Sequence, residues 1–283
     1  MNGYLIDMDG VIYRGEHVVT GAIEFVSALQ ARHVPFLFLT NNSQRTRLDI
    51  VIKLRRMGFL DIEERHVFTC SIATARFLRS QKPNPTAFVI GEGGLLSALN
   101  HFGIGITDKD PDYVVVGEGR TVSFEVLEQA TRHLANGAKL IATNLDPNCP
   151  TAHGPRPGTG AIIAMLERAS GRVALGIGKP SPITMRLARK ELGLRTAQII
   201  MVGDTLDTDI LGGVQMGYQT VLVLSGGTLI EEVKLSPFLP DYVVESVGTL
   251  AKHLDADGSI LLDPMRGTER DSYRDSLVLT GGY

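Results

Sequence analysis

Short runs of consecutive apolar residues alternate along this chain with stretches in which apolar positions recur every three or four residues. The N-terminal part shows the pattern, with an apolar run at Tyr4–Ile6, helical spacing within Gly21–His33 and a second run at Phe36–Leu39. Unbroken apolar runs are typical of parallel strands buried on both faces, and the longer spacing is typical of helices. The alternation therefore predicts βαβ units and a doubly wound α/β fold with a parallel sheet.

The same alternation continues to about residue 224. Further strands are expected at 87–90, 113–116, 140–142, 199–202 and 221–224. Helices are expected over 45–57, 95–101, 124–135 and 160–169, and from about 180 to 192. The polar, proline-containing segment Ser80–Pro85 reads as a linker, and no structure is assigned beyond about Asp255.

Composition narrows the class of protein. With 283 residues, 43% of them hydrophobic, the chain can bury a sizeable core and has room for two domains. A net charge of −3 gives no general attraction to a nucleic acid polymer or to a membrane surface, so neither is expected as a partner. No apolar run is long enough to cross a bilayer, and no signal peptide is expected before Asp7, because no basic stretch followed by an apolar stretch stands there. Two distant cysteines, Cys70 and Cys149, argue against a disulfide framework and favour the cytoplasm.

Asp7 and Asp9 directly follow the first expected strand. In an extended chain residues i and i+2 point the same way, so both carboxylates can face one pocket, and Gly10 lets the backbone turn away. One carboxylate can attack phosphorus to form an aspartyl phosphate, and the other can donate and accept the proton. For so short a pattern, an acidic turn after a strand is the alternative.

Asp204 follows the strand expected at 199–202. Carboxylates that converge from separate strands suit Mg²⁺, which prefers oxygen ligands, and we expect this ion as the cofactor. Asp207 is interpreted as the cap of a following helix rather than as a ligand.

Two further segments carry groups that suit a phosphate. Thr40–Asn42 ends a strand and offers hydroxyl, amide and backbone N–H donors, although a helix cap is an equal alternative. Lys179 could offset the repulsion between a phosphate and two aspartates, although a lone Gly-Lys-Pro is usually a surface turn. The suggestive residues lie before residue 42 and after residue 177, which indicates one site whose sequence is interrupted by an inserted α/β unit.

Taken in order, four segments resemble the signature motifs of the haloacid dehalogenase superfamily: Asp7–Val11, Thr40–Ser43, Gly178–Pro180 and Gly203–Asp209. Further segments resemble the NagD and para-nitrophenylphosphatase group within it, namely Val116–Glu118, Ala142–Asn144, Gly178–Pro182 and Val202–Asp204. The similarity extends to about Pro240. It implies a Rossmann-like catalytic core formed by 1–81 and 177–283, with an α/β cap inserted at 82–176.

The resemblance also implies a role for each site residue. Asp7 is expected to be the nucleophile and a Mg²⁺ ligand, and Asp9 the acid and base that lends its backbone carbonyl to the metal. Asp204 is a further metal ligand supported by Asp209. The residues expected to bind the phosphoryl group or substrate are Thr40, Asn41, Lys179 and Thr205.

The expected activity is Mg²⁺-dependent hydrolysis of small phosphomonoesters, such as nucleotide, sugar, pyridoxal or glycerol phosphates, through a phospho-aspartate on Asp7. A phosphotransferase or phosphomutase of the same fold is one alternative, and a phospho-aspartate switch without turnover is another. The size of the insertion favours a phosphatase, and Asp9 favours turnover. The oligomeric state is left open, with a homodimer among the options.

Substrate choice is expected to lie in the inserted unit, within Asn144–Gly160. This stretch is stiffened by prolines and carries polar side chains of both signs, at Asp146, His153 and Arg156. Arg156 could meet a second anionic group, and His153 could stack on a ring or hydrogen-bond to it. A plain surface loop is the alternative.

Overall fold

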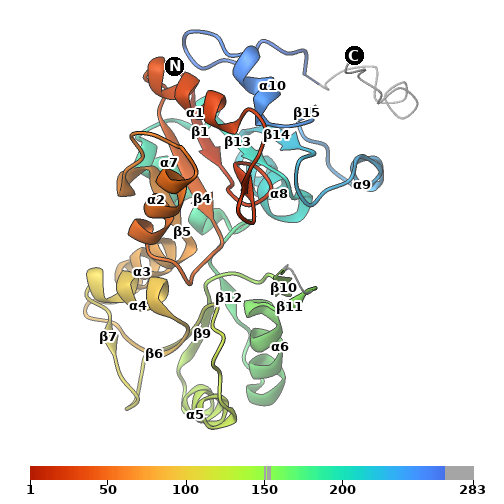
Figure 1. Ribbon diagram of the computed structural model, residues 1–283. Helices are drawn as coiled ribbons and strands as arrows, with labels where there is room; N and C mark the ends of the chain where they lie inside the picture. Colours follow the sequence, from red (N-terminus) through yellow and green to blue (C-terminus); the bar gives the residue numbers. More distant parts are fainter. Residues whose placement is uncertain (150, 152–153, 265–283) are drawn as a thin grey trace. The chain divides into compact units, whose positions relative to one another are not determined.

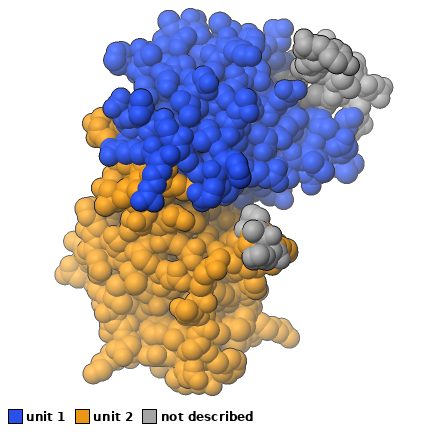
Figure 2. Space-filling view, viewed as in Figure 1, with its two compact units in different colours: residues 1–38, 54–62, 188–283 blue, residues 39–53, 63–187 orange. Residues whose placement is uncertain are grey.

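The computed structural model describes residues 1–149, 151 and 154–264, and it divides the chain into two compact units, coloured separately in Figure 2. Unit 1 comprises Met1–Phe38, Leu54–Ile62 and the described part of Ala188–Tyr283. Unit 2 comprises Leu39–Lys53 and Glu63–Leu187. Both units are discontinuous in sequence, so the chain passes between them several times.

Parallel strands form the centre of unit 1. In sheet order they are β15 (Tyr242–Val244), β14 (Gln219–Val223), β13 (Ile199–Gly203), β1 (Gly3–Ile6) and β4 (Phe36–Thr40), of which Phe36–Phe38 belong to this unit. Ile6 pairs with Val202 of β13 on one side and with Phe38 of β4 on the other. These strands are almost entirely buried, which explains why their sequences are unbroken apolar runs.

The strand order of this sheet changes direction between β1 and β13. From β1 the chain adds β4 on one side, and β13, β14 and β15 are added later on the other side. In open α/β sheets a ligand binds beyond the carboxyl ends of the strands at such a switch point. The residues that follow β1 and β13, Asp7 and Asp204, therefore stand at the expected place for a site.

Helices cover the sheet of unit 1: α1 (Ala22–Ala31), α8 (Leu211–Met216), α9 (Ile230–Leu235) and α10 (Val247–Lys252). Helix α1 buries Ala22, Phe25, Val26 and Leu29, at the spacing that predicted it, and packs against α10 (Figure 1). The ring of Phe25 meets that of Tyr4 in β1 edge to face, with 5.7 Å between centroids. A second cluster joins Val233 of α9 to Leu222 of β14.

The remaining elements of unit 1 are short. A β-hairpin, β2 (Tyr13–Arg14) and β3 (His17–Val18), follows β1. A 3₁₀ turn, η2 (Thr196–Gln198), precedes β13, and a π-helical turn, η3 (Leu206–Ile210), leads into α8. Two helices have residues in both units, α2 (Arg47–Arg56) and α7 (Pro182–Leu192).

Unit 2 contains a second parallel sheet, ordered β12 (Leu175–Gly176), β9 (Lys139–Ala142), β8 (Tyr113–Val116), β6 (Thr86–Ile90) and β7 (Gly105–Ile106). Its helices are α3 (Cys70–Gln81), α4 (Gly93–His101), α5 (Phe124–Ala135) and α6 (Thr159–Ser170). Apolar side chains of α5 and α6 form one core with those of β6, β8 and β9. The 3₁₀ turn η1 (Glu64–His66), the strand β5 (Val67–Thr69) and the hairpin of β10 (Asn148–Cys149) and β11 (Arg156–Pro157) complete the unit.

The α/β fold with parallel sheets flanked by helices is confirmed. The structure also contains elements that the sequence pattern did not predict, among them β5 and α3. Helix α3 ends at Gln81, so it occupies the start of the segment expected to be a linker. Just after Asp255, Gly258 is held against β1, because the Tyr4 hydroxyl donates a 2.8 Å hydrogen bond to the Gly258 carbonyl.

The strands of the second sheet all fall within residues 86–176, inside the stretch 82–176 that was expected to be an insertion. The compact units follow other boundaries, however, since Leu39–Lys53 and residues after 176 group with that sheet. The division into core and cap therefore stays a prediction. Among the residues that the structure describes, no helix combines the length and apolarity needed to cross a membrane.

Candidate active site

The two aspartates at the switch point are placed by adjacent strands. Asp7 directly follows β1 and is partly exposed, and its backbone N–H donates a 2.9 Å hydrogen bond to the carbonyl of Val202 in β13. Asp204 directly follows β13 and is only 7% exposed. The parallel pairing of Ile6 with Val202 thus brings both carboxylates to the same edge of the sheet.

The carboxylate of Asp204 accepts hydrogen bonds from the loop that follows β14 and from its neighbour Thr205. The backbone N–H of Gly227 donates to its Oδ2 at 2.6 Å, and the Thr205 hydroxyl donates to its Oδ1 at 3.3 Å. Gly10 and Gly226 approach this carboxylate so closely that a Cβ on either would overlap it. Gly10 also has φ +84°, a conformation that side-chain-bearing residues rarely adopt.

Asp209 lies in the π-helical turn η3 and is fully buried. Its Oδ2 accepts a 3.3 Å hydrogen bond from the backbone N–H of Thr205, which joins it to the residue that contacts Asp204. Gly203 allows this approach, because a Cβ there would overlap the Asp209 side chain. Asp207 lies inside the same turn η3 and is not its cap, since the residue at the N-cap of η3 is Thr205.

Three carboxylates of unit 1 could hold a metal ion together. Asp7, Asp204 and Asp209 each offer an oxygen atom, and these atoms lie within 4.8 Å of one another. Like charges this close are costly unless a cation offsets them, and three hard oxygen donors fit Mg²⁺. Asp209, expected only to support the ligands, thus stands among the groups within reach of the metal.

Asp9 is exposed, and its side chain is outside that group of three. Its backbone forms a bridge to Tyr13 at the start of the β2–β3 hairpin. The expected contribution of Asp9 to the metal is its backbone carbonyl, and its carboxylate is expected to transfer the proton. Both roles stay predictions.

Three of the residues expected to bind phosphate, Thr40, Asn41 and Lys179, belong to unit 2, whereas Thr205 belongs to unit 1. Thr40 ends β4, and its hydroxyl accepts a 3.1 Å hydrogen bond from the backbone N–H of Asn42. The side chain of Asn41 bonds to the backbone of Lys179. Helix α2 begins only at Arg47, so Thr40–Asn42 do not cap it, and the helix-cap alternative does not apply.

Lys179 is 4% exposed, and its Nζ donates a 3.1 Å hydrogen bond to the carbonyl of Leu39 in β4. A buried ammonium is costly to desolvate, so a lysine at a surface turn would not be placed in this way. The structure therefore excludes the surface-turn alternative for Lys179.

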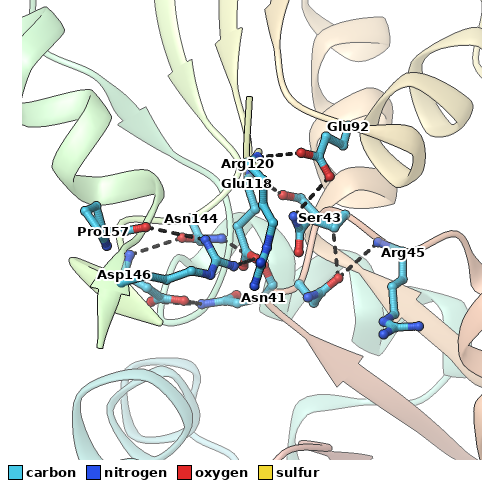
Figure 3. Close-up of polar contacts among 12 residues, drawn as sticks. Asn41, Ser43, Arg45, Glu92, Glu118, Arg120, Asn144, Asp146 and Pro157 are labelled. Atoms are coloured by element: carbon cyan, nitrogen blue, oxygen red, sulfur yellow. Dashed lines mark hydrogen bonds and ion pairs between the residues drawn. The ribbon is translucent and has the colours of Figure 1, made fainter. Parts of the chain in front are cut away.

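The structure gives different partners to two of the residues expected to choose the substrate, Asp146 and Arg156. Asp146 accepts hydrogen bonds from the Asn41 amide at 3.2 and 3.3 Å (Figure 3). Arg156 in β11 forms a 3.0 Å ion pair with Glu118, which follows β8 and is 7% exposed. Burial raises the pKa of the Glu118 carboxyl above its ordinary value, and the Arg156 guanidinium opposes this shift. His153 lies outside the described residues.

Sequence reasoning gave no role to Glu118 or Asn144. Asn144 donates a 2.8 Å hydrogen bond to the carbonyl of Asn41, and the Glu118 backbone N–H donates to the Ser43 hydroxyl at 2.7 Å. Both residues stand in segments that carried the family resemblance, Val116–Glu118 and Ala142–Asn144. Their place in those motifs was the signal that could have identified them.

Comparison with known proteins places this site in a family. Residues 4–105 match a family described as haloacid dehalogenase-like hydrolase, and residues 176–250 match one described as HAD-hydrolase-like. The two matches cover more than half of the chain. The chain belongs to the haloacid dehalogenase-like hydrolases.

Relatives narrow the assignment within that family. The dihydroxyacetone phosphatase of Corynebacterium glutamicum is 41% identical over 248 residues, which cover 88% of this chain and 90% of that protein. The ribonucleotide monophosphatase NagD of Escherichia coli is 37% identical over 87% of this chain and 96% of its own length. The structure of a p-nitrophenyl phosphatase from Archaeoglobus fulgidus aligns with a TM-score of 0.85 at 37% identity, covering 89% of this chain and 99% of that one. This chain is an enzyme, a phosphatase of the NagD-like group.

Proposed function

We propose that this phosphatase hydrolyses small-molecule phosphomonoesters with the help of Mg²⁺ and through a phospho-aspartate on Asp7. The observation that supports this most strongly is the group of three carboxylates, Asp7, Asp204 and Asp209, at the switch point of the sheet. Such a group combines a nucleophile with the ligands of a divalent cation.

In the proposed first step a carboxylate oxygen of Asp7 attacks the phosphorus in line with the ester bond. The new bond joins Asp7 to phosphorus, the bond from phosphorus to the ester oxygen breaks, and Asp9 gives its proton to that oxygen. In the second step Asp9 takes a proton from water, whose oxygen attacks the same phosphorus. The bond between phosphorus and the Asp7 oxygen breaks, inorganic phosphate leaves, Asp7 is again a carboxylate and Asp9 is again protonated.

When bound, Mg²⁺ would neutralise charge on the phosphoryl oxygens and lower their repulsion from Asp7. Asp7, Asp204 and the Asp9 backbone carbonyl are the proposed ligands, and Asp209 supports Asp204. Gly227 and Thr205 already hold the Asp204 carboxylate in one orientation, so little reorganisation is needed when the ion binds.

We assign Thr40, Asn41, Lys179 and Thr205 to the phosphoryl group. The ammonium of Lys179 supplies positive charge, and the Thr40 hydroxyl supplies a donor. The Thr205 hydroxyl has a single donor, which would turn from Asp204 Oδ1 to the phosphoryl group when substrate binds. The burial of Lys179 supports this role, since electrostatic stabilisation is stronger in a site that excludes water. Such groups recognise the phosphate and not the alcohol attached to it.

Recognition of the alcohol is assigned to residues 82–176, which we propose as the cap on a core formed by 1–81 and 177–283. Within it, Arg156 is the candidate for a second anionic group on the substrate, with His153 beside it in sequence. Two of the relatives are named dihydroxyacetone phosphatase and ribonucleotide monophosphatase. We propose a substrate from the same range of small phosphorylated metabolites, which includes nucleotide, sugar, pyridoxal and glycerol phosphates.

A screen of phosphomonoesters with Mg²⁺, reading released phosphate, tests the proposal. We expect one or a few compounds to be hydrolysed well above p-nitrophenyl phosphate in kcat/KM. A sugar acceptor included in parallel reactions would reveal phosphoryl transfer instead of hydrolysis. No phosphate release from any compound, by protein shown to be folded, would overturn the proposal.

A further inference from the structure

The side chain of Asn41 is bonded to the backbone of Lys179 at two points. The Lys179 N–H donates to Asn41 Oδ1 at 2.8 Å, and Asn41 Nδ2 donates to the Lys179 carbonyl at 3.1 Å. One planar amide thus holds both polar groups of the Lys179 backbone. It fixes the position from which the lysine side chain extends.

The amide can hold Lys179 in this way in only one of its two orientations. Its oxygen must face the Lys179 N–H, and its nitrogen must face the carbonyl. The two ends of an amide are nearly the same in shape, so hydrogen-bond partners decide between them. A carboxylate beside one end accepts from the nitrogen and repels the oxygen, and therefore selects one orientation.

Asp146 supplies that carboxylate. Both of its oxygens accept from Asn41 Nδ2, at 3.3 and 3.2 Å, and Figure 3 shows the two side chains facing each other. The amide group has two N–H donors, and the Lys179 carbonyl and the Asp146 carboxylate use both. Bonds to an ionised acceptor are stronger than those between neutral groups.

Hydrogen bonds from neighbouring groups fix the positions of Asp146 and Asn41. Asn144 Oδ1 accepts from the Asp146 backbone N–H at 3.1 Å, and Asn144 Nδ2 donates to the Asn41 carbonyl at 2.8 Å. Gly160, in the first turn of α6, donates its N–H to the Asp146 carbonyl at 2.9 Å. Gly178 lets the chain pass close by, since a Cβ there would lie 2.6 Å from Asn41 Oδ1.

We propose that Asp146 is a positioning residue rather than a contact to the substrate. It orients the Asn41 amide, which in turn places the backbone of Lys179 and so the ammonium that meets the phosphoryl group. This inference rests on the proposed function, and it changes the role that the sequence suggested for Asp146. Loss of the carboxylate should weaken phosphate binding equally for every substrate.

The experiment compares Asp146→Asn, Asn41→Ala and the double variant with the wild-type enzyme. Asn at position 146 keeps the shape but offers its own N–H donors, so either orientation of the Asn41 amide becomes acceptable. Asp146→Glu tests rescue by a carboxylate, and Asp108→Asn makes the same chemical change at an exposed loop position as a control. Thermal unfolding shows which variants are folded. The two measurements are the Ki of inorganic phosphate as a competitive inhibitor and kcat/KM on several phosphomonoesters, including p-nitrophenyl phosphate.

We expect Asp146→Asn to raise the Ki of phosphate by about tenfold, which is the effect of losing a hydrogen bond to a charged group. The same factor should appear in kcat/KM for every substrate. The double variant should be no worse than Asn41→Ala alone, because both changes break one chain of contacts. Asp146→Glu should recover part of the loss, and Asp108→Asn should match wild type.

Two results would overturn the inference. A substrate-dependent loss with an unchanged phosphate Ki would make Asp146 a contact to the leaving group. Equal activity of wild type and Asp146→Asn would show that the contact does not position Lys179. If Asp146→Asn does not fold, Asp146→Ala and Asn41→Asp provide the same comparison. Failure of the proposed function would look different, since the wild-type enzyme itself would release no phosphate.

Discussion

The backbone N–H of Gly227 donates a 2.6 Å hydrogen bond to Oδ2 of Asp204. A loop after β14 thus orients a carboxylate that follows β13, at the edge of the sheet where Asp7 also lies. Because the contact comes from the backbone, no side chain at position 227 can replace or improve it. The approach of Gly226 to the same carboxylate explains why a glycine stands at position 226.

Gly226→Ala should weaken the affinity for Mg²⁺ on the order of tenfold, as loss of a group that orients a metal ligand does. The new Cβ overlaps the Asp204 carboxylate and must displace it. The measurement is the Mg²⁺ concentration that gives half-maximal activity. Gly93→Ala is the matched control, since a Cβ there meets its nearest neighbour at 3.7 Å. Equal Mg²⁺ dependence of both variants would contradict the proposal that the Asp204 carboxylate beside Gly226 binds the metal.

Removal of the metal should abolish activity, and added Mg²⁺ should restore it. Three clustered carboxylates also repel one another without a cation, so Mg²⁺ should raise the unfolding temperature of the wild-type enzyme. Asp209→Asn should lose most of that thermal shift. Full activity after dialysis against excess EDTA, or an unfolding temperature that does not change when Mg²⁺ is added, would argue against a metal site here.

Glu118 should make stability depend on pH. Burial raises its pKa in the folded state above the ordinary value of 4.5, so the folded protein binds more protons than the unfolded chain between those two values. Its contribution to the free energy of unfolding therefore falls as the pH rises through that window and is constant above it. Glu118→Gln should lack this fall. Urea unfolding of both proteins from about pH 4 to about pH 8 measures it, and parallel curves would show that Glu118 makes no such contribution.

Replacing His153 and Arg156 by alanine should change the ratios of kcat/KM among substrates more than it changes hydrolysis of p-nitrophenyl phosphate. Arg156 should act on the alcohol portion, and the small artificial ester offers it little to contact. Arg168→Ala removes an exposed arginine from α6 and is the control. A uniform loss on all substrates would show that these residues do not select the substrate.

Much of the fold could be predicted because apolar runs and helical spacing are direct consequences of burial. Helix α3 was not predicted. It buries Ser71 and Thr74 along with its apolar residues, so the contrast between a buried apolar face and an exposed polar face is weak in its sequence. The segment after Asp255 was also missed, since it is held by backbone contacts such as the one from Tyr4 to Gly258. Contacts to the backbone are hard to predict from the sequence, because they depend little on residue type.

The candidate site, like the fold, could be predicted only in part. Asp7 and Asp204 could be proposed from the sequence because each follows a recognisable strand, and Lys179 because it stands in order with the other motifs. The partners of Asn41 and Arg156 could not, because Asp146 and Glu118 are brought to them by folding across distances of 105 and 38 residues. Residue type shows which groups are available, and only the folded chain shows which of them are already bonded to each other.

Trapping of the phospho-enzyme tests the central claim most directly. The enzyme is mixed with substrate and Mg²⁺, quenched in acid during turnover and treated with borohydride, which reduces an acyl phosphate to an alcohol. Peptide mass spectrometry then locates the reduced side chain. We expect it at Asp7 and nowhere else, and we expect Asp7→Asn to be folded, unlabelled and at least about 10³-fold less active. Reduction at another residue, or substantial turnover by Asp7→Asn, would contradict the account.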